Sequence, residues 1–521
     1  MLTFGKLIVG ASSAANYLDE IVPQDGCPAW APSAQRIVEQ VLGIDLSRPP
    51  TSTELARLLL ACRADNGRMW PARTRRRTVC GFDFVLQPHK SVALALVFAP
   101  TVDEASAIWG CISRANNIAM ELLASILGQA RKGKMGAGGT EPGCTTWLSI
   151  RHRTAWGTLA AKVGRNGTKA DSTVRVQGDP AVHIHNVLFN LVVTLDGRIG
   201  SLDSQRLSRA VVHLCGARFQ VELACELRAL GIHVTCGKDG ASAVLPAVDS
   251  RAVEFFSKRN RVIGSIARRF AERVGRRWED LSEKDDLAWL RRSAEISRLG
   301  GLRTLPNMQG WIEDASEIGW KHKSVVREFK PRQMSKAERI ECACTNATAQ
   351  AKATIASDTA LNEVWLRVFA MRGLIGAGLC EKADIELVSE HLRDFCEHAS
   401  STSIYRTCKR DHSFQGAILD ALWSNLAVNR QPHSECGTTL HANNVGIKRL
   451  AVEREISTIE GHPYARSAKN GRGMARQNTR FESNMKEMEN DSQMLDRAEK
   501  IRRAIAPSII AMAPDDSASS G

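Results

Sequence analysis

The sequence predicts an α+β fold in which strands and helices alternate, followed by a mainly helical C-terminal region. Short apolar runs at 79–86, 147–150 and 182–193 have the length and composition of buried strands. The apolar residues between 102 and 127 recur at helical spacing, which indicates a long helix. Strand signals fade beyond Pro331. Helices are expected there at 359–371, 382–398 and 415–426.

The first elements are a strand and a capped helix. Residues 1–9 alternate in polarity as a strand does, and Ser12 or Ser13 can cap a helix that carries Tyr17. That helix would pack behind the first strand. A Gly/Pro-rich connection and two helices are expected next, at 24–32, 33–42 and 53–63.

Basic segments flank the central elements. A run of arginines directly precedes the strand at 79–86, and it consists of Arg73, Arg75, Arg76 and Arg77. Such a run is commonly a solvated edge, but beside a nucleic-acid site it would hold phosphates. The following elements are predicted in order: a basic loop at 131–139, a basic hairpin or mobile insertion at 157–178, a turn at Asp196-Gly197, a helix at 204–230, a hairpin at 234–245 and basic helices at 250–299.

Three histidines are the strongest chemical signal in the chain. His183 and His185 lie in the apolar run at 182–193, and residues two apart on a strand face the same side of a sheet. His152 follows the run at 147–150, so a neighbouring strand could bring it onto that face. Three neutral imidazoles can hold a divalent metal and leave positions open for a ligand, as reactive metal sites do.

The histidine pair also has a simpler interpretation. Two histidines at alternate positions arise on the polar face of a sheet that binds nothing, and so short a motif specifies a site poorly. The surrounding residues are therefore needed to decide between the two interpretations.

The charge of the chain indicates a polyanionic partner. Its 521 residues carry a formal net charge of +14. Nucleic acid is the commonest such partner, although an acidic membrane surface fits the same charge. No apolar stretch is long enough to span a bilayer, and the N-terminus lacks the pattern of a secretory signal. We therefore expect a cytoplasmic protein of two or more domains without membrane insertion.

The 14 cysteines are scattered along the chain, and Cys342 and Cys344 are the closest pair. In a cytosolic protein they are expected to be reduced thiols, mostly buried. A zinc site is an alternative, although its spacings fit no known finger. Its ligands would come from Cys408, His412, His433, Cys436 and His441.

Several further motifs accompany the histidines in a characteristic order. They are the opening strand with the helix that holds Tyr17, Gly81–Phe84 followed by Lys90-Ser91-Val92, Arg151-His152, Asp179-Pro180 leading into His183, His185 and Asn190, residues 224–231, Gly237–Gly240 and Phe256–Arg259. In this order they resemble the relaxase domain of the MobF-type conjugative relaxases, which belong to the HUH endonuclease superfamily. The resemblance covers residues 1–259 and continues more weakly to about residue 320.

The resemblance implies an antiparallel five-stranded sheet of the HUH type, flanked by helices. It implies site- and strand-specific nicking and strand transfer at a plasmid transfer origin, with Tyr17 joined to the 5′ end of the DNA as a covalent phosphotyrosine. His152, His183 and His185 would hold a divalent cation, Mg²⁺ or Mn²⁺, with Zn²⁺ as an alternative. Asp83 would orient a histidine or take the tyrosine proton.

The implied residue types suit this chemistry on physical grounds. A phenol with a pKa of about 10 is a poor nucleophile at neutral pH, so a nearby cation and a carboxylate help to activate it. The cation also neutralises charge that develops on the phosphate oxygens. The chain has three tyrosines, and Tyr17 is the one near the N-terminus.

The implied partners are single-stranded DNA at the transfer origin, other relaxosome proteins and a coupling protein. Basic side chains near the motifs are candidates for phosphate contacts, each of which would steepen the salt dependence of binding. They are Arg73, Arg75, Arg76, Arg77, Lys132, Lys134, Lys258, Arg259 and Arg261.

The chain departs from the family pattern in three ways. MobF-type enzymes usually carry two pairs of tyrosines, whereas Leu18 follows Tyr17 here and residues 21–30 contain none. The connection from His152 to His183 is longer than usual. No phosphate-loop motif of an ATP-driven helicase is present, so unwinding by this chain is not expected.

We expect a nickase domain at 1–320, a helical region at 331–470 that is a helicase remnant or a module for partners, and a charged helix with a disordered tail at 471–521. Three other functions stay open. They are a rolling-circle replication initiator, a relaxase-derived DNA-binding protein with impaired catalysis, and a zinc hydrolase that uses metal-bound water. The hydrolase would leave Tyr17 and the basic charge unexplained.

Overall fold

The computed structural model describes residues 2–8, 28–60, 62–68, 79–133, 136–155, 158–163, 169–176, 178–273, 275–278, 289–290, 293, 307–326, 334–356, 361–399 and 412–428. They form two compact units, each of which is described by itself. The first contains the described residues of 2–153, 180–255 and 310–428. The second contains those of 154–179 and 256–309.

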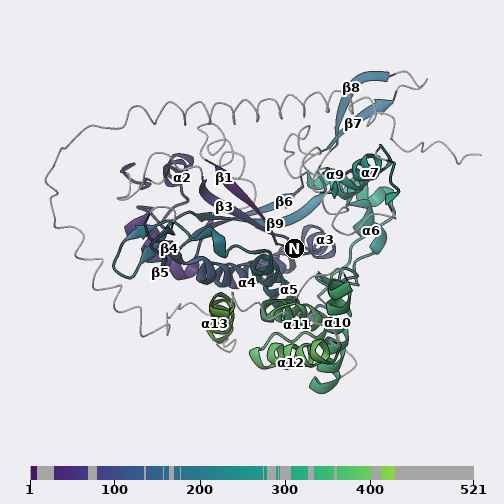
Figure 1. Cartoon of the computed structure of the whole chain (residues 1–521). Helices are drawn as coiled ribbons and strands as arrows, with labels where there is room; N and C mark the ends of the chain where they lie inside the picture. Colours follow the sequence, from purple (N-terminus) through teal and green to yellow (C-terminus); the bar gives the residue numbers. More distant parts are fainter. Residues whose placement is uncertain are drawn as a thin grey trace, which may run out of the picture. The chain divides into compact units, whose positions relative to one another are not determined.

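A five-stranded sheet is the centre of the first unit (Figure 1). Its strands are β1 (Leu2–Ile8), β2 (Ala29–Trp30), β3 (Val79–Leu86), β6 (Trp147–Thr154) and β9 (Pro180–Phe189). Their order is β1-β3-β9-β6-β2, and β1 with β3, β3 with β9, and β2 with β6 are antiparallel. The predicted α+β fold with an antiparallel five-stranded sheet is confirmed, and β3 has the bounds expected from the sequence.

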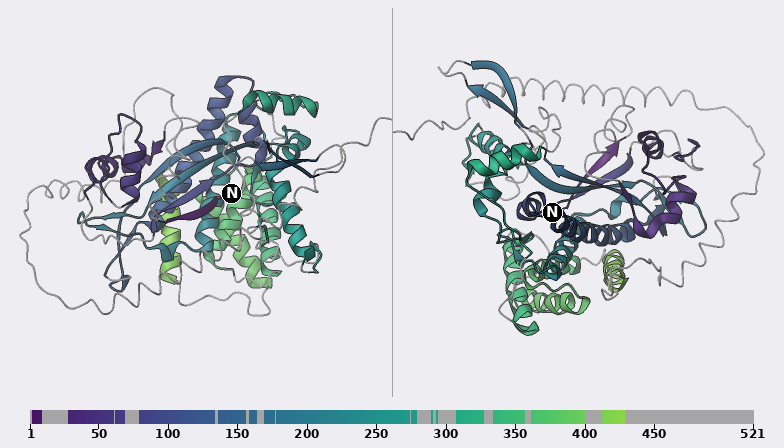
Figure 2. Two further views of the ribbon diagram at one scale, coloured as in Figure 1. Left: turned by 90° about the horizontal axis from the view of Figure 1, so that it is seen from above. Right: turned by 180° about the vertical axis from the view of Figure 1, so that it is seen from behind.

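Two long helices, α4 (Val102–Leu127) and α5 (Arg209–Ala229), lie along one face of this sheet (Figure 2). The Thr101 side chain caps α4 by accepting a hydrogen bond from the backbone of Glu104. Helix α4 has the predicted bounds, whereas the helix expected at 204–230 is interrupted. A 3₁₀ turn, η4 (Ser204–Arg206), precedes α5, and Ser208 caps α5 by accepting a hydrogen bond from the backbone of Val211. The shorter helix α3 (Lys90–Val97) packs against β9.

The opposite face of the sheet is covered at one end by a short helical segment. It consists of η1 (Pro32–Ala34), the π-helix η2 (Ile37–Val41) and α2 (Ser52–Leu59). Leu55 and Leu58 of α2 join Val187 and Phe189 of β9 in one hydrophobic cluster. The helix expected at 33–42 is thus mainly 3₁₀ and π, since the backbone of Leu42 donates to a carbonyl five residues earlier.

Short strands complete the β structure of this unit. A four-stranded sheet has the order β11-β10-β5-β4, and β12 pairs with β13. These strands are β4 (Gln129–Arg131), β5 (Thr140–Cys144), β10 (Val192–Thr194), β11 (Ile199–Gly200), β12 (Thr235–Cys236) and β13 (Ala243–Val244). Both predicted hairpin turns are present, and Gly197 and Gly240 adopt positive φ angles of 77° and 63° there.

The C-terminal part of the first unit is helical, as predicted. Its helices are α9 (Met308–Glu317), α10 (Lys336–Ala356), α11 (Glu363–Ala377), α12 (Lys382–Ala399) and α13 (His412–Val428). Helix α11 packs against α5 and α13 against α4. The buried guanidinium of Arg218 donates to Asn425 at 3.1 Å, and Asn425 donates to the carbonyl of Ile118 at the same distance. A helix before these, α6 (Ser250–Phe255), packs against α3.

The second unit contains an antiparallel hairpin and a basic helix. The hairpin is formed by β7 (Thr158–Val163) and β8 (Lys169–Val176), which confirms the hairpin expected at 157–178. Helix α7 (Lys258–Arg273) begins where a carboxylate oxygen of Asp179 accepts a hydrogen bond of 2.7 Å from the backbone of Lys258. Acidic groups are favourable at this position because the helix N-terminus carries partial positive charge.

Membrane-spanning helices and the state of the cysteines can be examined over all the described residues. None of their helices is long and apolar enough to cross a membrane. The cysteines among them are free thiols, of which Cys144 and Cys342 are exposed and Cys111 and Cys215 are buried.

Candidate metal centre

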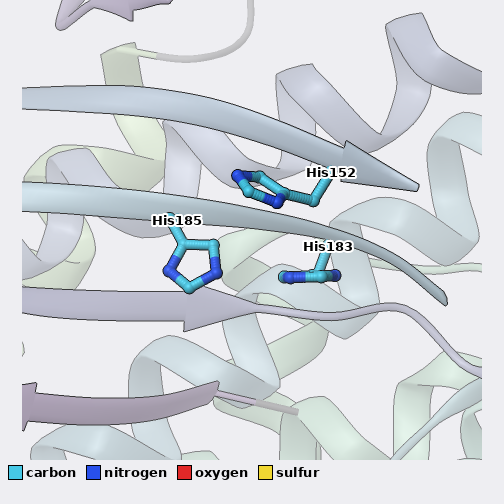
Figure 3. A group of neighbouring side chains, drawn as sticks. All are labelled: His152, His183 and His185. Carbon is cyan, nitrogen blue, oxygen red and sulfur yellow. The ribbon is translucent and has the colours of Figure 1, made fainter. Parts of the chain in front are cut away.

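The three predicted histidines meet on one face of the central sheet (Figure 3). His183 and His185 are at alternate positions of β9, and His152 is on β6, the next strand in the sheet. The ring centroid of His152 lies 5.2 Å from that of His183 and 5.0 Å from that of His185. The remaining pair is 5.0 Å apart. One nitrogen from each ring lies within 4.8 Å of the other two, so a single cation could contact all three.

Hydrogen bonds fix the orientation of two of the rings. Nδ1 of His183 lies 2.8 Å from the carbonyl oxygen of Ala181, and Nδ1 of His185 lies 2.8 Å from a carboxylate oxygen of Asp83. A carbonyl and an ionised carboxylate can only accept, so Nδ1 is the donor in each ring. In its neutral form such a ring has its lone pair on Nε2, which is the nitrogen that would bind a metal.

Strand register explains why Asp83 reaches His185. In the antiparallel pair of β3 and β9, Val85 lies opposite His185 and Asp83 opposite Val187, so Asp83 is a diagonal neighbour on the same face. The carboxyl of Asp83 is buried, and its second oxygen makes no hydrogen bond with any residue that the structure describes. That oxygen is therefore available to a further donor.

On the face of the sheet opposite to the histidines, a network of buried amides holds strand β9 in place. Asn186, which directly follows His185 on β9, is fully buried and exchanges side-chain hydrogen bonds of 3.0 and 2.9 Å with Asn116 of α4. Ser149 of β6 donates to the same amide oxygen of Asn186 at 2.7 Å. The network joins the two histidine-bearing strands to α4. At the start of β9, Lys90 of α3 donates to the carbonyl of Pro180 at 2.6 Å.

The donor set fits a divalent cation. His152 is 5% exposed and the other two rings are partly buried, so a cation held there would lose much of its water and gain imidazole ligands instead. The oriented rings and the carboxylate behind His185 are the usual supporting groups of a metal site. A histidine pair on a sheet face that binds nothing would not account for the third ring or for Asp83.

The structure describes only some of the other predicted site residues. Tyr17 and five of the basic candidates lie outside the described residues, and the five are Arg73, Arg75, Arg76, Arg77 and Lys134. Most residues of the alternative zinc site also lie outside them. Lys132 is described, and its ammonium group lies 3.4 Å from the carboxylate of Glu141. Lys258, Arg259 and Arg261 belong to the first turn of α7.

The sequence did not predict the groups that orient the histidines or hold their strands in place. The Asn116–Asn186 pair joins positions far apart in the chain, and the backbone carbonyl of Ala181 leaves no side-chain signal. A polar Asn186 inside an apolar strand was the one visible sign, because a buried amide requires partners.

A comparison with protein families supplies the decisive observation. The family model described as TrwC relaxase matches residues 12–296, which is more than half of the chain. The chain belongs to the TrwC relaxase family. This confirms the resemblance to MobF-type relaxases, and the matched range includes the three histidines and Asp83.

Solved structures of conjugative relaxase TrwC in complex with oriT DNA are also similar to this chain. A metal-bound, a metal-free and a copper-bound structure each have 22% sequence identity and a TM-score of 0.45. Each match covers 62% of this chain and 99% of the other. No curated protein matches. Membership in the TrwC relaxase family rests on the family model.

Proposed function

We propose that this member of the TrwC relaxase family nicks one DNA strand at a plasmid transfer origin and holds the cleaved strand through a covalent 5′-phosphotyrosine. The observation that carries the proposal is the oriented group of His152, His183 and His185, within a chain that the family model identifies as a relaxase. The net charge of +14 suits a DNA substrate.

We assign the three histidines as ligands of a divalent cation. Such a cation would neutralise charge on the scissile phosphate and help to position it. Mg²⁺ and Mn²⁺ are the ions we favour, with Zn²⁺ as an alternative. The carboxylate oxygen of Asp83 that lies 2.8 Å from His185 and the carbonyl of Ala181 would serve the reaction by keeping the rings of His185 and His183 in place.

Tyr17 is the proposed nucleophile. Its phenolate oxygen forms a bond to the scissile phosphorus while the bond to the 3′ oxygen breaks, so the 3′ hydroxyl leaves and the 5′ phosphate stays on the tyrosine. The bond energy is retained in the phosphotyrosine, and attack by a 3′ hydroxyl can later rejoin the strand. Asp83 is the proposed acceptor of the phenolic proton, either directly or through a water molecule.

The proposed DNA contacts are electrostatic. Basic side chains at 73–77, at 132 and 134, and in the first turn of α7 would bind phosphates of the single strand. The domain boundaries predicted from the sequence, the partner proteins beyond DNA and the role of the helices after residue 331 remain part of this proposal.

A cleavage assay tests the proposal. A labelled single-stranded oligonucleotide that carries the transfer origin is incubated with the whole chain and Mn²⁺, and the products are separated under denaturing conditions. We expect cleavage with wild type, and its loss with a chelator or with His183→Ala. DNA affinity should change by less than about threefold, since charge supplies most of it.

His391→Ala is the matched control because this exposed histidine of α12 lies outside the metal site. It should cleave at the wild-type rate. Undiminished cleavage by His183→Ala, or cleavage that survives complete removal of divalent ions, would contradict the assignment of the histidines.

A further inference from the structure

A cavity of about 620 Å³ lies in the first unit, away from the elements that carry the histidines. It is formed by the C-terminal end of α5, the β12–β13 hairpin, α10 and the C-terminal end of α11. Its polar lining includes Arg228, Lys238, Arg339, Asn346 and Gln350. The cavity volume is in the range of sites that hold small ligands.

Positive charge is concentrated in this cavity. Burial lowers the pKa of Arg228, and the nearby charge of Arg339 lowers it further, so the two guanidinium groups are close enough to repel each other. Neither of them, nor Lys238, forms an ion pair with a carboxylate among the described residues. Asp239 is the acidic group in the lining, and its carboxylate accepts hydrogen bonds from Ser242 and from the backbone of the hairpin turn.

The arginines cap the C-terminus of α11, but this role explains only part of the positive charge in the cavity. Arg228 donates to the carbonyl of Gly376 and, at 2.5 Å, to that of Val234, while Arg339 donates to the carbonyl of Ala377 at 3.4 Å. The C-termini of α5 and α11 each carry about half a negative charge. These two half charges and Asp239 do not balance three full positive charges.

Each of the two arginines has one donor that the capping hydrogen bonds do not use. The Nε groups of Arg228 and Arg339 are both buried, and neither has a hydrogen-bond partner among the described residues. A buried donor on a charged group without an acceptor destabilises the folded state. The outer nitrogens of the two guanidinium groups and the ammonium group of Lys238 can bind an anion with several acceptor oxygens.

We propose that this cavity is a phosphate-ester site in which Arg228, Arg339 and Lys238 bind the phosphate oxygens. The amides of Asn346 and Gln350 line the same cavity and can bind the rest of the ligand. Gln350 lies against Gly240 at the hairpin turn, where a Cβ atom would come within 3.1 Å of its side chain. The phosphate comes either from a free nucleotide or from a DNA strand. The inference does not depend on DNA nicking.

Binding measurements on the whole chain test the site. The probes are inorganic phosphate, deoxyadenosine monophosphate and a short single-stranded oligonucleotide without the cleavage sequence, each titrated by calorimetry. The variants are Arg339→Gln and Lys238→Gln. Loss of one charge-assisted hydrogen bond should weaken binding about tenfold.

Arg209→Gln is the matched control, because it removes the same charge from an exposed position of α5 outside the cavity. Weaker binding of the monophosphate by both variants, relative to this control, identifies a free nucleotide as the ligand. A tenfold effect confined to the oligonucleotide identifies a DNA phosphate. The site is refuted if both variants bind all three probes as the control does. Lys238 is exposed in the hairpin turn, so Lys238→Gln decides the matter should Arg339→Gln fail to fold.

Discussion

The metal centre depends, at the scale of single residues, on groups that orient the histidines. Asp83 acts on His185 through one hydrogen bond of 2.8 Å. Its carboxylate fixes the tautomer and the orientation of the ring, both of which strengthen metal binding.

Asp83→Asn should therefore weaken Mn²⁺ binding about 10- to 100-fold, as loss of such a supporting group usually does. Calorimetry with Mn²⁺ measures the change, and an unchanged unfolding temperature shows that the fold is retained. Asp196→Asn is a suitable control since Asp196 lies in an exposed hairpin turn. Equal affinities for wild type and Asp83→Asn would refute the orienting role.

Glu54 gives a prediction about pH. The hydrogen-bonded guanidinium of Arg48 lowers the pKa of Glu54 from 4.5 to about 2, helped by hydrogen bonds from Thr51 and opposed by burial. A carboxyl whose pKa is lower in the folded state stabilises that state above pH 4.5, and the effect is lost as the pH falls toward 2. Glu54→Gln should cost about 1–2 kcal/mol at neutral pH.

The difference in unfolding free energy between wild type and Glu54→Gln should shrink as the pH falls from about 6 to about 3. Denaturant unfolding at several pH values measures it. A difference that stays constant over this range would show that the ion pair with Arg48 does not hold in solution.

The sequence predicts where a single side chain lies only if the spacing of residues along a strand or helix determines its face. The period of two on β9 predicts that His183 and His185 share a face, and His152 joins them because its strand is the neighbour of β9. The carbonyl of Ala181 and the amide of Asn116 could not be predicted, because they depend on which elements pack together.

Element packing holds the two histidine strands against α4 through buried amides. Asn186 and Asn116 exchange two hydrogen bonds, and Asn186 also donates to the carbonyl of Phe84 at 3.1 Å. Truncating either amide removes two hydrogen bonds from its buried partner, which costs about 1–3 kcal/mol.

A double-mutant cycle tests this packing. Asn116→Ala and Asn186→Ala should each destabilise the protein by about 1–3 kcal/mol, and the double variant should lose clearly less than the sum. Denaturant unfolding gives the three free energies. Additive losses would mean that the two amides do not interact.

The observed bounds of a helix or strand agree with the predicted bounds where the sequence shows a single, uninterrupted pattern. Strand β3 and helix α4 have the predicted bounds, since each has a single period and clear ends. The segment at 32–41 became 3₁₀ and π helix, and the helix expected from 204 starts only after Ser208. Packing and capping decide such cases, and both depend on the folded chain.

At the scale of the whole molecule, the two compact units do not follow the order of the chain. The described residues of 154–179 and 256–309 form one unit, although β9 and α5 of the other unit lie between them in the chain. Long-range contacts of this kind have no local signal. The predicted boundaries at 320 and 470 remain a prediction.

Net charge leads to a prediction at the same scale. Affinity for a single-stranded oligonucleotide should fall as salt rises, with a logarithmic slope of about 0.7 for each phosphate contact. Arg261→Gln, in the first turn of α7, should reduce that slope by about one contact. Arg251→Gln removes a charge that is already paired with Asp249 and should leave it unchanged. Identical slopes for both variants would exclude this turn of α7 from the DNA interface.

The proposed reaction requires that Tyr17 and the histidine site act on the same phosphodiester. The most direct measurement is mass spectrometry of the protein–DNA adduct formed with a transfer-origin oligonucleotide and Mn²⁺. The three tyrosines of the chain make it decisive. We predict a DNA-linked peptide that contains Tyr17, no adduct with Tyr17→Phe, and wild-type adduct with Tyr405→Phe and Tyr464→Phe. An adduct that persists in Tyr17→Phe, or cleavage without any covalent intermediate, would contradict the account.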